Sequence, residues 1–170
     1  MHEYITTNAM FIGHLPAGFL LTHWLQNKLK TKKFLWVGLL ASIFPDIDML
    51  YFYLVDNRQT LHHHYWTHLP LFWIALGIFL ILIAKIFNKR ALYIITIIAL
   101  ANIILHLVLD SIVGGINWPY PFIDYDVFLF TVPAKYNFWV WNFILHWTFL
   151  FEVIAIIAAA VLLYKRRKGD

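Results

Sequence analysis

The sequence contains no cysteine, two serines and few charged residues, and each shortage excludes a kind of chemistry. Without cysteine there are no disulfides and no thiolate ligands, so a bound metal must use nitrogen and oxygen donors. The two serines are Ser42 and Ser111, and neither lies in a Gly-x-Ser-x-Gly turn, which argues against a serine hydrolase. A glycine-rich phosphate loop and a His-Glu-x-x-His zinc-protease helix are also missing from the sequence.

Charged residues make up 13% of the 170 residues, whereas 62% are hydrophobic and 19% are aromatic. A soluble domain has about 25% charged residues, so this chain cannot cover a water-facing surface. It is expected to form a single integral membrane domain over residues 1–170. The net charge of +4 comes from basic clusters at the ends of apolar segments, which is typical of membrane proteins, so nucleic acid is not expected as a partner.

Five apolar segments are long enough to cross a bilayer, which takes about 20 residues of α-helix. The expected helices are 8–26, 34–55, 70–87, 91–112 and 137–164. Because connections alternate between the two sides, the basic residues of 27–33, 88–90 and 165–170 fall on one side. The positive-inside rule places that side in the cytoplasm and the N-terminus outside. The sequence thus predicts an all-α, polytopic bundle in a prokaryotic-type plasma (inner) membrane.

Polar residues within these apolar segments mark a candidate site, because ionisable groups are costly there. They come from four separate places: His14, Pro45-Asp46-Ile47-Asp48, His62 to His68, and His106 with Asp110. On the predicted topology, all four lie in the outer third of the bilayer. A divalent metal is the simplest partner for imidazoles and carboxylates together, and zinc suits these ligands best, with manganese or iron as alternatives.

Within this set, the residues alone leave several roles open. His106 and Asp110 are four residues apart and share a helix face, so they can grip one ion or form a hydrogen-bonded pair. Asp46 and Asp48 follow a proline that should bend the helix. They can bridge two cations, or one can bind metal while the other steadies a histidine. Not all four histidines between His62 and His68 can be ligands.

The order of these motifs resembles that of the YdjM-like family of membrane-bound, metal-dependent hydrolases. The family pattern has an early His, Pro-Asp-x-Asp, His-Arg-Gly-x-Thr-His, and His-x-x-x-Asp followed by Gly and Trp-Pro. The matching segments here are His14 with Gly18, Pro45 to Asp48, His63 to His68, His106 to Asp110, and Gly115 to Pro119. The resemblance covers 14–122 and implies this set of metal ligands: His14, Asp46, Asp48, His63, His68, His106 and Asp110.

One departure from the pattern concerns the substrate. His64 and Tyr65 stand where the family has Arg-Gly, so an anionic substrate would depend on Arg58 or Lys135 instead. The family is also distantly similar to zinc-dependent phospholipase C and P1-type nucleases. Their later His-x-x-x-Glu pair is missing, which leaves one or two ions. Residues expected to support the ligands are His64, Thr67, Trp118, Asn142 and His146.

These features predict a membrane-embedded, metal-dependent hydrolase of a phosphoester or another amphipathic lipid substrate at the extracytoplasmic interface. The metal would activate a water molecule, with Asp46 or Asp48 as a catalytic bridge or base. Two alternatives use the same cluster: a metal or proton transporter or sensor, and a non-catalytic membrane scaffold with a structural metal. A transporter needs ionisable groups toward the inner side, where only His23 and Glu152 are expected. Membrane lipid is the expected partner, and the sequence does not indicate an oligomeric state.

Overall fold

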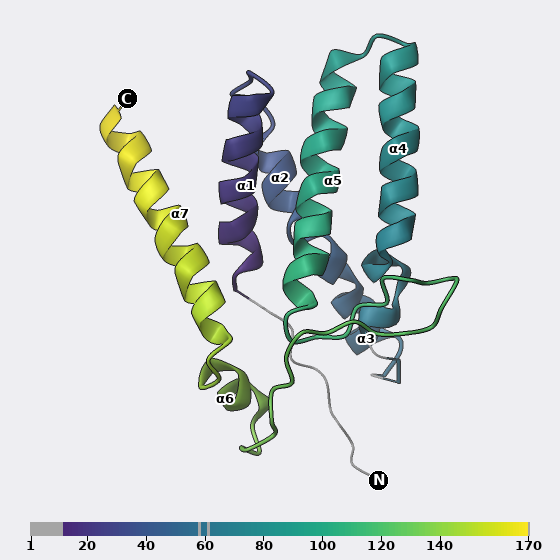
Figure 1. Ribbon diagram of the computed structural model, residues 1–170, viewed down its shortest axis with the longest axis vertical. Helices are drawn as coiled ribbons and strands as arrows, with labels where there is room; N and C mark the ends of the chain where they lie inside the picture. The colour runs from purple at the N-terminus through teal and green to yellow at the C-terminus, as the bar shows by residue number, and fades with distance from the viewer. Residues whose placement is uncertain (1–11, 58, 61, 170) are drawn as a thin grey trace.

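The computed structural model describes residues 12–57, 59–60 and 62–169. The regular secondary structure of this part of the chain is helical, apart from one isolated β-bridge between Ile116 and Val127. The predicted all-α class is therefore confirmed. The elements in chain order are α1 (His14–Lys28), α2 (Leu35–Ala41), η1 (Pro45–Ile47), α3 (Asp48–Leu54), η2 (His62–His64), η3 (Trp66–His68), α4 (Pro70–Ile86), α5 (Arg90–Asp110), α6 (Trp139–Ile144) and α7 (Phe149–Gly169) (Figure 1).

Helix α5 is the centre of the bundle. It packs against α4, α1 and α2, and α7 lies against the outer side of α1 (Figure 1). Ile98 and Leu107 of α5 are completely buried, and these apolar contacts hold α5 in place. A buried polar face runs along the same contact with a spacing of four residues, which keeps side chains on one side of a helix. Its members are His14, Gly18, Thr22 and Gln26 on α1, Gly38 and Ser42 at α2, and Asn102, His106 and Asp110 on α5.

Two glycines allow α1 and α2 to approach one another closely. A Cβ atom on Gly38 would lie 1.8 Å from Thr22 Oγ1, and one on Gly18 would lie 2.4 Å from the Cβ of Ser42. Neither position could accept a side chain without moving the neighbouring helix. Small residues permit such close packing of membrane helices. Here the packing brings the end of α2, with Ser42, up to α5.

The helix lengths test the predicted spans. Only α5 is an unbroken helix long and apolar enough to cross a membrane among the described helices, and Leu35–Ala41 with Pro45–Leu54 qualifies as one further span if its 53° bend is accepted. Pro45 explains this bend, because proline lacks the N–H that would continue the helix. The apolar helix α4 has 17 residues, which corresponds to about 26 Å.

The last expected helix, 137–164, is wrong as a single element. The chain forms α6 and α7 instead, with a break between Ile144 and Phe149. In the break, His146 Nδ1 lies 2.9 Å from Thr148 Oγ1, and Thr148 is completely buried. Such local side-chain hydrogen bonds compete with helical backbone bonding. The first expected helix, 8–26, begins at His14 in the described part, and 8–11 lie outside the described residues.

The basic clusters lie at one end of the bundle, as the sequence predicts. The α1–α2 connection, the α4–α5 connection and the C-terminus lie at one end, the upper end in Figure 1. Helix α3, helix α6 and the long segment 111–138 lie at the other. The basic clusters of 27–33, 88–90 and 165–168 therefore share one end of the molecule.

Candidate metal site

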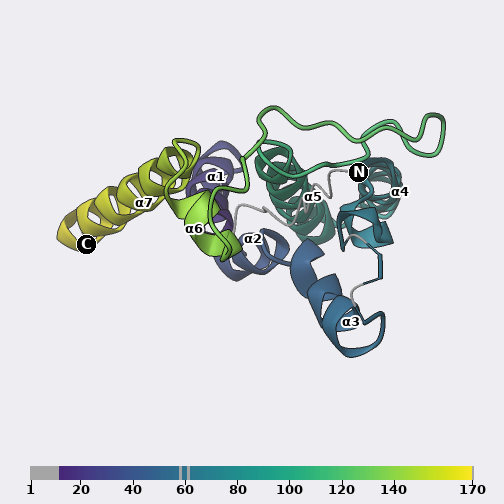
Figure 2. The same ribbon diagram turned by 90° about the horizontal axis from the view of Figure 1, so that it is seen from below.

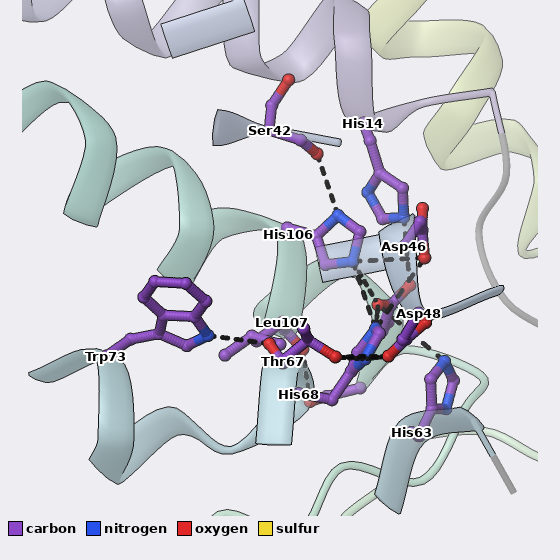
Figure 3. A network of polar contacts seen from close by, with 12 residues as sticks. His14, Ser42, Asp46, Asp48, His63, Thr67, His68, Trp73, His106 and Leu107 are labelled. Carbon is purple, nitrogen blue, oxygen red and sulfur yellow. Dashed lines mark hydrogen bonds and ion pairs between the residues drawn. The ribbon is translucent and has the colours of Figure 1, made fainter. Parts of the chain in front are cut away.

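Four side chains from three separate elements converge at the lower end of α5. His106 and Asp110 come from the last two turns of α5. His68 comes from η3 and Asp46 from η1 at the proline bend, and Figure 3 shows both side chains beside His106. One ligand atom from each lies within 4.8 Å of all the others. The His–x–x–x–Asp spacing on α5 thus puts both residues on one face, as the sequence predicts.

The separations suit a tetrahedral ion. The Nε2 atom of His106 lies 3.0 Å from Asp110 Oδ2, 3.5 Å from Asp46 Oδ1 and 3.4 Å from His68 Nε2. The Nε2 atom of His68 lies 3.6 Å from Asp110 Oδ2 and 3.8 Å from Asp46 Oδ1. Metal–ligand bonds of 2.0–2.1 Å in a tetrahedron require ligand atoms about 3.3 Å apart. The five contacts bracket that value.

Both imidazoles are held from behind by hydrogen-bond acceptors. His106 Nδ1 donates to the carbonyl of Ser42 at 2.9 Å, and His68 Nδ1 donates to Asp48 Oδ2 at 2.7 Å. In a neutral ring, a proton on Nδ1 leaves a lone pair on Nε2. The two Nε2 lone pairs and two carboxylate oxygens then face a common point. Histidine ligands of metals typically have such a partner on the second nitrogen.

The carboxylate of Asp110 shows most clearly that a cation fits. It is completely buried, and neither oxygen has a hydrogen-bond partner among the described residues. Yet His106 Nε2 and His14 Nε2 approach its oxygens to 3.0 and 3.1 Å. These distances are short enough for hydrogen bonds, so the angles at the donor and acceptor atoms are what prevents them. An uncompensated buried carboxylate is very costly, and a metal ion between these groups would compensate it.

Protons are the other way to compensate this charge. Burial lowers the pKa of the His68 imidazole, but two carboxylates outweigh burial and raise it to about 9. They are Asp110, whose Oδ2 lies 3.6 Å from Nε2, and Asp48, which accepts the Nδ1 proton. A divalent ion and a proton on His68 would therefore compete for the same cluster, since an Nε2 atom that binds metal must be unprotonated.

Asp48 and Thr67 form a second layer behind His68. Thr67 donates a hydrogen bond to the same oxygen of Asp48 that accepts from His68, and all three residues are buried. The indole N–H of Trp73 donates to the carbonyl of Thr67 at 2.7 Å, which ties this layer to α4. Of the two roles that the sequence leaves open for Asp48, the geometry favours steadying a histidine.

His14 and His63 lie on the flanks of the cluster. His14 stacks on His106 with ring centroids 4.0 Å apart, and His63 lies 4.9 Å from the His68 ring and 3.9 Å from Asp110 Oδ2. Both are buried, with 1% and 4% of the residue exposed. All seven expected ligands therefore come together, with four at the common point and three around it.

The other residues expected to support the site make contacts elsewhere. His64 Nε2 lies 2.9 Å from Asp126 Oδ2, and Trp118 donates to Ser111 Oγ at 2.8 Å. Asn142 bonds to the backbone N–H and carbonyl of Tyr136. Together with the His146–Thr148 contact, these interactions order the segment 111–138 and its junction with α7.

Sequence reasoning missed two features. The first is the Ser42 carbonyl that accepts from His106. Pro45 could have indicated it, because a proline leaves the carbonyls three or four residues before it without their helical partner. Glu152 is the other: it was expected in the inner half but lies in the first turn of α7. Its carboxylate accepts from the backbone N–H of Ile12 at 3.3 Å, next to the start of α1. Arg58, one of the two expected anion-binding residues, lies outside the described residues, and Lys135 is exposed.

Comparison with known proteins agrees with the family resemblance of the motifs. No curated protein and no solved structure gives a significant match. The distant similarity to phospholipase C and P1-type nucleases therefore stays a prediction. The sequence model described as "YdjM inner membrane protein" matches residues 10–169, which is nearly the whole chain. The protein thus belongs to the YdjM family of inner membrane proteins.

Proposed function

We propose that the protein is a membrane-embedded, metal-dependent hydrolase whose metal ion binds Asp46, His68, His106 and Asp110. One observation carries this proposal: four ligand atoms converge at tetrahedral spacing, with each imidazole fixed from behind by Ser42 or Asp48. A helix-packing contact alone would not need two histidines and two carboxylates aimed at one point. Zinc fits this donor set best, and manganese or iron are the alternatives.

The proposed topology has five spans, formed by α1, the bent α2–α3 unit, α4, α5 and α7. It is supported by the basic clusters, which share one end of the bundle, and by the metal-ligand cluster, which lies at the opposite end. The positive-inside rule puts the basic end in the cytoplasm. The site then faces the extracytoplasmic interface, and α6 with the segment 111–138 lies at that surface.

The residues of the site have different roles in the proposed hydrolysis. A divalent ion held by these four ligands would take a water molecule as a fifth ligand, lower the pKa of that water and polarise the scissile group. Asp46 is 30% exposed while the other three ligands are completely buried, so it is the carboxylate that can take up a proton from the water. Asp48 holds His68 and is unsuited to that role. His14 and Asp110 Oδ1 can hold a second ion beside the first. The substrate is a phosphoester or another amphipathic molecule.

The transporter alternative requires charged or titratable groups between the cluster and the cytoplasmic end. The buried polar face continues there through Thr22, Asn102 and Gln26, which are neutral. His23, the titratable residue expected in this half, lies on α1 outside that face, against Phe19 and Asn27. Close packing at Gly38 fills the space beside Thr22. Glu152 was expected to serve the inner half but lies at the opposite end of α7. These observations favour a closed site over a path.

Elemental mass spectrometry of untagged protein, with and without Asp110→Asn, tests the proposal. We expect about one or two equivalents of metal in the native protein and a loss of metal in the variant. Asp56→Asn is the matched control, because Asp56 binds Thr60 outside the cluster. Circular dichroism checks that both variants fold. No metal after reconstitution with zinc, manganese or iron would overturn the proposal.

The metal-loaded protein is then assayed with bis(p-nitrophenyl) phosphate and with phospholipid in detergent micelles. Hydrolysis that needs both the metal and Asp46 is the expected result. Metal binding without hydrolysis of either probe would instead favour the scaffold with a structural metal. Asp46→Asn is the informative variant, assayed at a metal content matched to that of the native protein, because it keeps the shape of the side chain while removing its basicity.

A further inference from the structure

We propose that a membrane phospholipid reaches the metal centre sideways from the bilayer, with its phosphate at Asp46 and an acyl chain along the exposed face of α3. This inference rests on the proposed metal site and adds the substrate's route and its docking surface. The docking surface consists of Ile47, Leu50 and Leu54.

The first observation is where the cluster opens. His68, His106 and Asp110 are completely buried, whereas 30% of Asp46 is exposed. Asp46 stands at the bend between α2 and α3. Phe44 and Ile47, which flank Asp46 and the buried Pro45 in the sequence, are exposed by 39% and 49%. A molecule that contacts the ion from outside therefore arrives at Asp46, and the surface around that point is apolar.

The second observation is the character of α3. Ile47, Leu50 and Leu54 recur at intervals of three and four residues and are exposed by 49%, 61% and 77%. That spacing puts them on one face, while Asp48 and Phe52 are buried on the other. An exposed apolar row of this kind is unfavourable in water but matches hydrocarbon. In an inner membrane protein, the chemistry that covers it is an acyl chain.

The third observation is that the opposite side is closed. The segment 111–138 crosses beside the lower end of α5, on the side away from α3 (Figure 2). It is fixed by backbone bonds from Leu129 to Ser111 and from Phe130 to Ile112, at 2.8 and 2.9 Å. Gly114 packs so tightly on His63 that an added Cβ atom would lie 2.5 Å from the ring.

A contact between side chains adds to this closure. His64 Nε2 lies 2.9 Å from Asp126 Oδ2, which ties the segment 111–138 to η2. Entry from the side of this segment would have to break that contact and separate Gly114 from His63. Entry at Asp46 breaks no contact of the segment, so the lipid-facing side offers the route.

The headgroup chemistry follows from the charges at the opening. The titratable groups that face Asp46 are His106, His68 and Asp110, with His106 Nε2 and His68 Nε2 at 3.5 and 3.8 Å from its Oδ1. None of these is a permanent cation such as lysine or arginine, so a divalent ion supplies the positive charge that faces the ligand. Hard anionic oxygens, as in a phosphate group, suit such an ion. A lipid that combines a phosphate with acyl chains thus satisfies both the ion and the α3 face.

The test uses the full chain, loaded with zinc in dodecyl maltoside, and a fluorescent-tailed phosphatidylglycerol as probe. We expect binding that depends on zinc and that weakens at least about tenfold in Ile47→Asp, a change of about 1.4 kcal/mol. Ile78→Asp is the matched control, because Ile78 of α4 is 52% exposed and lies away from the bend. Glycerol phosphate and diacylglycerol, which each carry half of the ligand, should compete at least about tenfold less well than phosphatidylglycerol.

A second measurement guards against misfolding of the charged variant. The chain contains no cysteine, so Ile47→Cys carries a single thiol. In native membranes, a water-soluble, membrane-impermeant maleimide should label it much more slowly than Tyr125→Cys, because Tyr125 is an exposed residue of the segment 111–138. Equal labelling would show that the α3 face meets water and would overturn the inference.

The outcomes separate this inference from the proposed function. If zinc binds but glycerol phosphate competes as well as the phospholipid, the lipid route is wrong while the metal site stands. Equal losses of phospholipid affinity in Ile47→Asp and Ile78→Asp would also show that the lipid route is wrong while the metal site stands. If zinc does not bind at all, the proposed function fails, and the lipid route fails with it.

Discussion

Replacing Asp48 by asparagine is the sharpest test of how the cluster is built. Asp48 Oδ2 accepts the Nδ1 proton of His68 at 2.7 Å and also accepts from Thr67. Asparagine has nearly the same shape but no charge. If Asp48 orients His68, the variant should still bind zinc, but more weakly, because the Nε2 lone pair is less basic and its direction is less fixed.

The size of the effect follows from the contact. A hydrogen bond to a charged group contributes about 1.5–3 kcal/mol, which corresponds to about 10- to 150-fold in affinity. Loss of the partner behind a metal-bound histidine costs about 10- to 100-fold in metal affinity. We therefore expect zinc binding to weaken by about 10- to 100-fold. Asp110→Asn should have a larger effect, because Asp110 contributes a ligand atom itself.

Competition with a chromophoric zinc chelator in detergent measures these affinities. Asp56→Asn again serves as the control, since Asp56 accepts the backbone N–H of Thr60 at 2.7 Å and has no part in the cluster. A loss as large as that of Asp110→Asn would mean that Asp48 is itself a ligand. No loss beyond that of Asp56→Asn would refute the idea that Asp48 positions His68.

Two further predictions concern packing and protons. Gly38→Ala should lower the unfolding temperature by an amount that reflects about 1–3 kcal/mol of overpacking, because its Cβ would meet Thr22 Oγ1 at 1.8 Å. Gly77→Ala should cost less, since the obstructing atom is the flexible end of Leu100, and equal shifts in thermal unfolding would contradict this. Zinc binding at pH 7 should release about one proton, because the raised pKa of His68, about 9, keeps the metal-free ring protonated there. Calorimetry in two buffers of different ionisation enthalpy measures the release, and a value near zero would exclude it.

The elements that were predictable from sequence are those that local pattern determines. The expected helices 70–87 and 91–112 correspond closely to α4 and α5, because both are uninterrupted apolar runs with polar ends. The bend in 34–55 was also predictable from Pro45. The sequence also predicted that the seven expected ligands lie at one end of the bundle. The position of each residue in its helix gives its depth, and the charge of the connections gives the side. Neither step needs tertiary contacts.

The remaining features depend on contacts that no local pattern contains. No proline or glycine marks the break between α6 and α7, where His146 and Thr148 bond to one another. The misplacement of Glu152 followed directly from treating 137–164 as one helix. Sorting the ligands into an inner four and an outer three was likewise inaccessible, because it depends on side-chain directions.

The geometry of Pro-Asp-x-Asp explains why its two carboxylates differ in role. Successive residues rotate by about 100–120° about a helical axis, so side chains two apart diverge strongly and cannot easily meet one ion. The structure places them instead on two edges of one ring. Asp46 Oδ1 lies 3.8 Å from His68 Nε2, and Asp48 Oδ2 lies 2.7 Å from Nδ1. The residue between them, Ile47, faces outward.

The proline bend therefore connects every part of the site. It ends α2 so that the carbonyl of Ser42 is free to accept from His106, and it starts the turn that sends Asp46 and Asp48 to either edge of His68. It also turns α3 by 53° away from α2, which brings the apolar face of α3 next to the one partly exposed ligand. A straight helix would bury Ser42's carbonyl in its own hydrogen bonding and separate the two carboxylates from His68. The bend is thus a requirement of the proposed metal site, and Pro45→Ala should cost metal affinity as well as stability.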